Sequence, residues 1–220
     1  MSEKLSNFDK FSPDLPIVAR SYAEVFSGFP WYEVSRCDSC GTFGSSLPEA
    51  SSSCLKCGTG VLKLEAYPLD ETVDYIKEEL SHRTPHGILG ATVDFGERGM
   101  RVEGFGWGYG LSKLELVEAK YHSGEMQEMV CRLLTEHPVF FYVSEVGVIP
   151  DLQRKGLGTD LTTSLVEYAT QYHRAIVLRT NEDSGMRKIA ERLGMKPMYG
   201  LTTGLKDSEN EARVLFLGVV

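Results

Sequence analysis

The chain has 220 residues, of which 42% are hydrophobic and 25% charged, and its formal net charge is -8 at pH 7. These are the proportions of a soluble globular protein with one core of ordinary size, or of one domain that carries an insertion. The acidic balance argues against broad nucleic-acid binding, which needs a positively charged surface. No apolar run approaches the roughly 18–20 residues of a membrane span, and residues 1–10 form no apolar signal segment. We therefore expect a cytoplasmic protein with no membrane partner.

The spacing of apolar residues predicts alternating helices and strands along the chain. The first half of the chain has helices over 17–26 and 70–80, then strands over 88–94 and 101–109 that form a hairpin, and then a loop and helix over 111–136. The second half has a strand over 139–149, a helix from about 157, a strand over 175–180 and a helix ending at 193. A solvated loop over 202–212 and a strand over 213–219 follow. Such a mixture predicts an α/β or α+β sheet.

Two Cys-x-x-Cys pairs, Cys37 with Cys40 and Cys54 with Cys57, interrupt this pattern after the first helix. Each pair can direct two thiolates at one ion, and two such turns complete a tetrahedral shell of four sulfurs. A glycine directly after each pair supplies the backbone freedom that these turns need. The spacing predicts a zinc ribbon over about 35–62, and the closed shell predicts a structural Zn²⁺ rather than a catalytic one.

The four cysteines have two alternatives to zinc. Two disulfides would need an oxidising compartment, which nothing in the chain indicates, whereas iron or an iron–sulfur cluster also accepts four thiolates. The four charges between residues 36 and 60 cancel, so the ribbon lacks the basic surface of a nucleic-acid binder. We interpret it as a stabilising insertion or one that shapes a neighbouring site. The fifth cysteine, Cys131, has the helical apolar spacing of a core residue.

A glycine-rich turn follows the apolar strand that ends near Pro150. Gly156 and Gly158 let the backbone come close to a ligand, and the first amides of the next helix have no partner within the helix. Together with the helix dipole, these amides predict a phosphate-binding turn. A P-loop is excluded, because the chain has no Gly-x4-Gly-Lys-Ser/Thr.

The run from Gln153 to Gly158 resembles the Q/R-x-x-G-x-G/A motif that binds the pyrophosphate of acetyl-coenzyme A in GNAT-type N-acetyltransferases. The likeness extends over most of residues 17–219 and is strongest over 140–196. It implies a mixed, mostly antiparallel sheet whose fourth and fifth strands splay apart to admit pantetheine. On this reading residues 1–220 form one acetyltransferase domain, with the ribbon inserted at 35–62.

The resemblance implies a set of residues that bind acetyl-coenzyme A. The backbones of two strand residues would pair with pantetheine, and the turn would hold the pyrophosphate. One further residue would come from the end of the strand over 175–180, which with the helix after it is similar to a second conserved block of the family. They are Val146, Val148, Gln153, Arg154, Lys155, Gly156, Leu157, Gly158, Thr159 and Asn181. The family transfers acetyl directly to an amine, and the Val148 amide would hold the oxyanion.

Glu145 is the candidate general base, because it is a carboxylate in an otherwise apolar strand and burial would raise its pKa towards neutrality. It could instead pair with an arginine, and water could relay the proton. The tyrosine that protonates the thiolate in many relatives is replaced by Ala190, and Tyr199 is a possible substitute. The aromatic residues Trp31, Tyr32, Phe105, Trp107 and Tyr109 could line the acceptor pocket, although core packing is the more common role for any one of them, because aromatic side chains dominate protein cores.

The sequence leaves two hypotheses. One is an N-acetyltransferase that uses acetyl-coenzyme A and an amine acceptor, which could be a small molecule or a protein. The other is a catalytically silent coenzyme A-binding module whose ribbon docks a protein or RNA partner. A zinc hydrolase is disfavoured by the closed four-thiolate shell. Nothing in the sequence specifies an oligomeric state.

Overall fold

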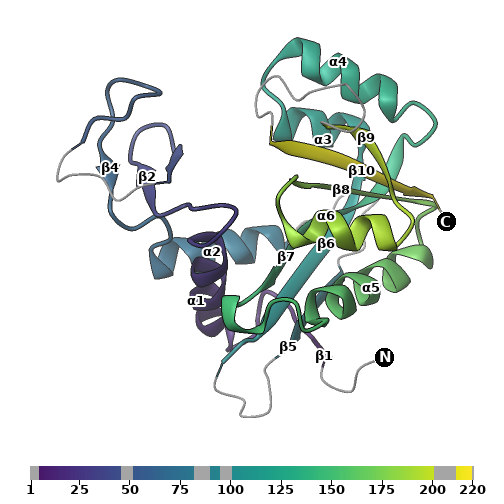
Figure 1. Ribbon diagram of the computed structural model, residues 1–220, viewed down its shortest axis with the longest axis horizontal. Helices are drawn as coiled ribbons and strands as arrows, with labels where there is room; N and C mark the ends of the chain where they lie inside the picture. Colours follow the sequence, from purple (N-terminus) through teal and green to yellow (C-terminus); the bar gives the residue numbers. More distant parts are fainter. Residues whose placement is uncertain (1–4, 46–51, 82–89, 95–100, 201–211, 220) are drawn as a thin grey trace.

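The computed structural model describes residues 5–45, 52–81, 90–94, 101–200 and 212–219 (Figure 1). Its helices and strands follow the predicted order. They are β1 (Leu5–Asn7), α1 (Leu15–Phe26), β2 (Ser35–Cys37), β3 (Phe43–Gly44), β4 (Leu62–Lys63), α2 (Leu69–Glu79), β5 (Gly90–Asp94), β6 (Gly104–Ser112), α3 (Lys113–Lys120), α4 (Gly124–Leu133), β7 (Val139–Val148), a short 3₁₀ helix η1 (Pro150–Leu152), α5 (Leu157–Thr170), β8 (Ala175–Asn181), α6 (Gly185–Arg192), β9 (Lys196–Tyr199) and β10 (Arg213–Val219).

The main sheet has seven strands in the order β1-β5-β6-β7-β8-β10-β9. Every neighbouring pair is antiparallel except β7 with β8, which run parallel. The predicted mixed, mostly antiparallel sheet is thus confirmed. The turn of the predicted hairpin, at residues 96–99, and most of the loop predicted over 202–212 lie outside the described residues.

Helices cover both faces of this sheet. Helices α5 and α6 pack against one face around Phe141, Leu178 and Phe216. Helices α1 and α2 cover the other face over β5 and β6, and α3 and α4 cover the same face over β7, β8 and β10. In Figure 1 the two groups on this second face lie apart, with α1 and α2 at the left and α3 and α4 at the top.

Strand β6 explains how α5 comes so close to the sheet. Its sequence alternates glycine with a large apolar residue, so Gly104 and Gly106 face α5 on one side. The large side chains lie on the other face, where Phe105 and Trp107 pack with α1 and α2 and Tyr109 and Leu111 pack with α3 and α4. A Cβ on Gly104 would lie 2.8 Å from Leu161 Cδ1 of α5. The alternation therefore sets the distance between helix and sheet.

The segment between β6 and β7 differs from the prediction. In place of one loop and helix there are two helices, and each has its own N-terminal cap. Ser112 and Glu115 form a capping box at the start of α3, and the Ser123 hydroxyl accepts a hydrogen bond from the Met126 amide at the start of α4. The second cap divides the segment, because it satisfies the amides of a new helix.

The four-cysteine segment forms a separate three-stranded sheet, in the order β3-β2-β4. In Figure 1 it projects from the body of the molecule above α1 and α2. It leaves the chain after α1 and returns to it at α2. Both ends of the segment are therefore anchored by helices of the second face.

Gly147 of β7 should tolerate no larger residue. A Cβ there would lie 2.3 Å from Cζ of Phe105, a fully buried ring. We predict that Gly147→Ala lowers the free energy of unfolding by about 1–3 kcal/mol, as overpacked core positions do, measured by urea denaturation. Gly124→Ala is the control, since its Cβ would meet nothing within 4 Å. Equal stability of the two variants would contradict this account.

Candidate active site and metal centre

Strands β7 and β8 separate before either of them ends. They pair only through Phe141 with Ile176, Tyr142 with Val177 and Val143 with Leu178. Beyond these pairs β7 runs on to Val148 and β8 to Asn181. The pairing of β7 with β6 continues over the whole length of β7. One edge of β7 is therefore left open towards β8, as the predicted splay requires.

The open edge presents backbone donors. The Ile149 amide donates to the Glu103 carbonyl on the β6 side. Because successive amides of a strand point to opposite edges, the amides of Val148 and Val146 point away from β6, into the gap. The Val148 carbonyl accepts a hydrogen bond from the Gln153 side chain at 3.2 Å.

The glycine-rich turn lies directly beyond this edge. Arg154 and Gly156 both have positive φ, 64° and 99°, and Gly156 is the residue before α5. Only glycine adopts such a φ easily, and a Cβ on Gly156 would meet nothing within 4 Å. The turn thus exposes its own backbone and the first amides of a 14-residue helix. This geometry suits an anionic ligand.

A single cavity of about 1170 Å³ joins the turn to the second face of the sheet. It passes the open edge of β7, where Val146, Gly147 and Val148 line it, and reaches α1, α2 and the ribbon. The predicted binding residues that line it are Val146, Val148, Gln153, Arg154, Gly156, Gly158 and Thr159. The other three, Lys155, Leu157 and Asn181, do not line it. The Asn181 side chain accepts a hydrogen bond from the Asp183 amide at 2.9 Å.

Glu145 lies on the second face, at the point where the cavity crosses the sheet. A bulge places it there: Trp107 pairs with Glu145 and Gly108 with Val143, which leaves Ser144 between them without a partner across the strand. Because paired residues share a face, Glu145 lies beside Trp107 under α1 and α2.

Two helix residues that the sequence did not single out contact this carboxylate. The hydroxyls of Tyr22 and Tyr75 donate to Glu145 Oε1 at 3.4 and 3.2 Å. Burial, and then the nearby Glu79 carboxylate, raise the pKa of Glu145 to about 7, and Lys120 opposes the shift. Half of the groups are therefore ionised near neutral pH, as suits a general base.

A second carboxylate, Glu33, lines the same part of the cavity. It accepts a hydrogen bond from the Tyr67 hydroxyl, and burial raises its pKa to about 7 against the influence of Arg213. Nothing in the sequence pattern identifies Glu33, because it lies in an irregular segment between α1 and β2.

The predicted aromatic residues divide between core and cavity. Trp31 lines the cavity, and Phe105, Trp107 and Tyr109 are buried in the core. Tyr32 is 47% exposed and does not line the cavity. Neither position considered for the thiolate acid, Ala190 or Tyr199, lines the cavity. Ala190 is buried, and the Tyr199 hydroxyl interacts with the Tyr121 hydroxyl at 2.8 Å and with Arg179 Nε at 3.1 Å.

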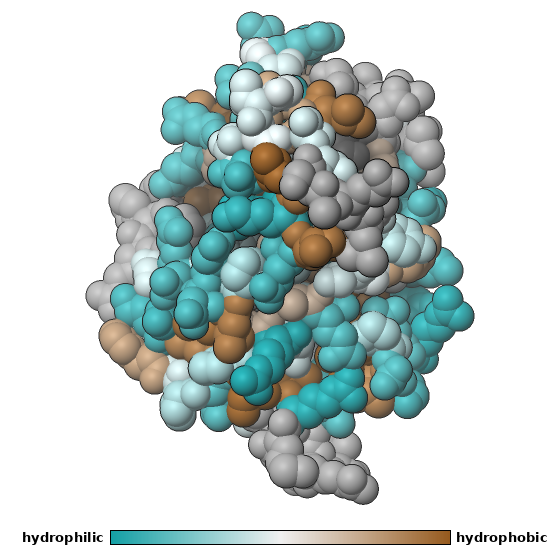
Figure 2. Space-filling model, turned by 90° about the vertical axis from the view of Figure 1, so that its left-hand side faces the viewer, coloured by the Kyte–Doolittle hydropathy of each residue, from teal (hydrophilic) through white to brown (hydrophobic). Residues whose placement is uncertain are grey.

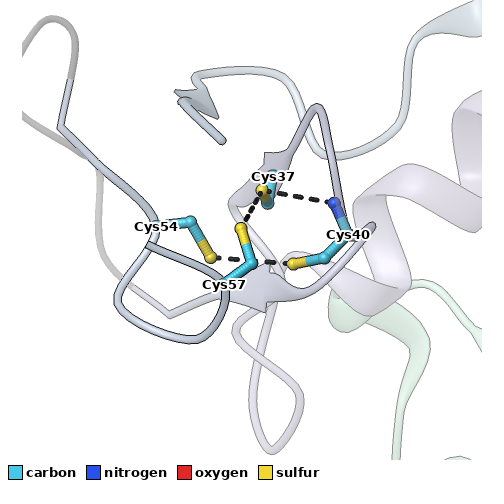
Figure 3. A group of neighbouring side chains, drawn as sticks. All are labelled: Cys37, Cys40, Cys54 and Cys57. Carbon is cyan, nitrogen blue, oxygen red and sulfur yellow. Dashed lines mark hydrogen bonds between the residues drawn. The ribbon is translucent and has the colours of Figure 1, made fainter. Parts of the chain in front are cut away.

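The four ribbon cysteines meet at one point (Figure 3). All are free thiols whose sulfurs lie within 4.8 Å of one another. The sulfurs of Cys37 and Cys57 are 3.7 Å apart, as are those of Cys40 and Cys54. Four sulfurs held about 2.3 Å from a tetrahedral zinc ion would be about 3.8 Å apart. The group therefore fits one Zn²⁺, and sulfurs 3.7 Å apart are too far from each other to form the disulfide bonds of the alternative, in which they would be about 2.05 Å apart.

The ribbon also contacts the cavity. The Phe43 ring stacks on the Tyr67 ring at 5.3 Å between centroids, and Arg36 forms an ion pair with Glu71 of α2 at 3.4 Å. Both ribbon residues line the cavity. Figure 2 shows this side of the molecule, where apolar side chains lie in small groups between polar ones. The ribbon thus forms one wall of the cavity.

Several solved structures match this chain over almost its whole length. A Drosophila melanogaster polyamine N-acetyltransferase matches 98% of this chain and 99% of its own, with a TM-score of 0.58 at 13% identity. A Sinorhizobium meliloti phosphinothricin acetyltransferase of the GNAT superfamily, solved with acetyl-coenzyme A, matches 100% and 89%, with a TM-score of 0.53 at 13% identity. A putative GNAT acetyltransferase from Desulfovibrio desulfuricans matches 98% of both chains, with a TM-score of 0.52 at 14% identity.

The chain therefore has the GNAT acetyltransferase fold, as its resemblance predicted. No protein-family model and no curated protein sequence matches it. Among the helices that the structure describes, none has both the length and the apolar character to cross a membrane.

Metal analysis tests the ribbon directly. We predict one zinc ion per chain in the purified protein and its loss in Cys57→Ser, because three sulfurs cannot close the shell. Cys131→Ser, which changes a thiol outside the cluster, should keep the zinc. Elemental analysis checks both variants. Iron in place of zinc, or full zinc retention by Cys57→Ser, would contradict the assignment.

Proposed function

We propose that this protein is an N-acetyltransferase that moves the acetyl group of acetyl-coenzyme A directly to a primary amine. One observation carries the proposal: a single cavity runs from an anion-binding turn, past an open strand edge, to a carboxylate with a pKa of about 7. Acetyl transfer from a long, phosphate-bearing thioester needs these three parts in this order.

Acetyl-coenzyme A would enter from the turn side. The exposed amides from Gly156 onwards and the Arg154 side chain would hold its pyrophosphate. Pantetheine would lie along the open edge of β7 and pair with the backbones of Val146 and Val148, as an added strand does. The solved complex of the S. meliloti enzyme with acetyl-coenzyme A supports this cosubstrate for the shared fold.

The amine would approach from the second face, beside Glu145. Glu145 would take a proton from the ammonium, directly or through water, and the freed nitrogen would attack the thioester carbonyl. The Val148 amide, which points into the gap, would donate to the oxyanion. The new C–N bond forms, the C–S bond breaks and coenzyme A leaves as its thiolate, because neither Ala190 nor Tyr199 lines the cavity where an acid would be needed. Amine N-acetyltransferases among the similar structures support an amine acceptor.

The ribbon, which we assign to residues 35–62 of a single domain, would support the acceptor side of the cavity. Its ion, held by four thiolates, would fix the positions of Phe43 and Arg36 and would take no part in the chemistry. The alternative, a silent coenzyme A-binding module, gains some support from the buried Ala190. Consumption of acetyl-coenzyme A in the presence of an amine separates the two functions.

Calorimetric titration tests the cosubstrate site. We predict that acetyl-coenzyme A binds with a Kd in the micromolar range, roughly -8 kcal/mol. Arg154→Glu should weaken binding by about tenfold or more, because it places a negative charge beside the pyrophosphate. Arg132→Glu makes the same charge change on the exposed surface of α4 and should bind normally. The proposal fails if the wild-type protein binds no acetyl-coenzyme A.

A pH–rate profile tests the base. A carboxylate must be ionised to accept a proton, so kcat/KM should rise with pH through about 7 and level off above it. Glu145→Gln should remove this rise and reduce the plateau by about 10²–10⁴-fold. Glu33 has a similar pKa, so Glu33→Gln is the matched control and should keep the rise. A profile that Glu145→Gln leaves unchanged would assign the base elsewhere.

A further inference from the structure

A buried carboxylate, Glu79, lies behind the candidate base and outside the cavity. It is the last residue of α2, it is only 6% exposed, and it is not among the residues that line the cavity. A buried carboxylate is costly unless hydrogen-bond donors surround it. Neither proton transfer nor cosubstrate binding, as described above, involves this side chain directly. Its contacts indicate what it does.

Donors from two neighbouring strands converge on the Glu79 carboxylate. From β6, the Trp107 indole N–H donates to Oε2 at 3.3 Å, and the Tyr109 hydroxyl lies 3.3 Å from Oε1 and 3.2 Å from Oε2. From β7, the Ser144 hydroxyl donates to Oε2 at 2.6 Å, the shortest of these contacts. The carboxylate therefore joins the end of α2 to both strands of the pair that carries the bulge.

The Ser144 contact lies at the bulge itself. Side chains of a regular strand alternate between the two faces, but here two consecutive residues reach the second face. Ser144 contacts Glu79, and Glu145 contacts the hydroxyls of Tyr22 and Tyr75. A bulge redirects side chains in this way, and its extra residue lacks the cross-strand pairing that would fix it. A short hydrogen bond to a carboxylate is strong enough to hold that residue in place.

Glu79 also acts on Glu145 through its charge. Burial, and then the Glu79 carboxylate, raise the pKa of Glu145 to about 7. The charged and titratable side chains that face Glu145 come from α1, the segment after α1, α2, α3 and β10, and they are Tyr22, Glu33, Tyr75, Glu79, Lys120 and Arg213. Among these side chains, Glu79 is the largest cause of the raised pKa.

We propose, resting on the function given above, that Glu79 is a positioning residue for acetyl transfer: by holding Ser144 at the bulge, it directs the Glu145 carboxylate into the cavity. Glu79 itself touches neither substrate, since it does not line the cavity. The alternative is that Glu79 only fastens α2 to β6 in the core. In that case its loss would lower the free energy of unfolding without changing how Glu145 titrates.

The titration of Glu145 separates these two roles. Full-length protein labelled with carbon-13 at its glutamate carboxyls is followed by NMR as the pH changes, and the Glu145 signal is the one that Glu145→Gln removes. In the wild type its midpoint should lie near pH 7. In Glu79→Gln the midpoint should shift to lower pH, because removing a neighbouring negative charge makes Glu145 easier to ionise.

Ser144→Ala tests the bulge contact alone, because it leaves the charge of Glu79 in place. Without the hydroxyl, Glu145 should no longer be held in its buried position. Its midpoint should then also shift to lower pH, since burial is the largest cause of the raised pKa. Ser144→Thr keeps a hydroxyl and should titrate near the wild-type midpoint. Glu118→Gln removes a charge from the exposed surface of α3 and should do the same.

The consequence for the reaction is measured as release of coenzyme A from acetyl-coenzyme A. The acceptor is 2-phenylethylamine, whose ring suits the aromatic residues that line the acceptor side. In Glu79→Gln and Ser144→Ala, kcat should fall by about 10- to 100-fold, because a misplaced base transfers the proton less efficiently. The Kd for acetyl-coenzyme A should be unchanged in Glu79→Gln, and this binding also shows that the variant is folded.

A wild-type midpoint in Ser144→Ala, or in a folded Glu79→Gln, would overturn the inference, and so would an unchanged kcat in both variants. If Glu79→Gln does not fold, Ser144→Ala and Ser144→Thr decide alone. The titrations need no acceptor, so they decide even if 2-phenylethylamine is not acetylated. Failure of the proposed function has a different signature: the wild-type protein would not bind acetyl-coenzyme A, or Glu145→Gln would leave the pH–rate profile unchanged.

Discussion

The arrangement depends on one interrupted pairing, the end of hydrogen bonding between β7 and β8 at Val143 and Leu178. Unpaired backbone groups inside a protein are costly. A strand edge that remains open next to a cavity can therefore bind a ligand whose polar groups pair with it. The strand is held in place because β6 pairs with its other edge on both sides of the bulge at Ser144. Glycines in β6 let α5 lie close on the sheet, and this brings the helix start and its turn to the end of the gap.

The two faces of the sheet provide different chemical groups to the cavity. The face under α5 and α6 provides backbone amides for an anionic cosubstrate, whereas the face under α1 and α2 provides ionisable side chains. On that second face, carboxylates and guanidiniums lie partly buried, where interactions between charges are stronger than in water. The raised pKa of Glu145 follows from this burial and from Glu79, which itself accepts hydrogen bonds from Ser144 and Tyr109.

The parts that could be predicted from the sequence are those that local patterns encode. The four cysteines and the glycine turn are set by spacings of a few residues, and the alternation of glycine with aromatic residues marks β6. The environment of Glu145 is different, because Tyr22 and Tyr75 are 123 and 70 residues away from it in the chain. Arg213 likewise lies at the start of a strand, and no local pattern in the sequence indicates that its guanidinium stacks on the Trp31 ring. Short strands such as β1 and β9 carry too few residues for a periodic signal.

Hydrogen exchange of backbone amides, with and without acetyl-coenzyme A, tests the central claim most directly. If pantetheine pairs with the open edge, the amides of Val146 and Val148 should exchange more slowly in its presence, together with those that follow Gly156. The Ile149 amide already donates to Glu103 and should change little. Unchanged exchange at Val146 and Val148, under conditions where acetyl-coenzyme A is bound, would show that the cosubstrate does not use this edge and would contradict the account.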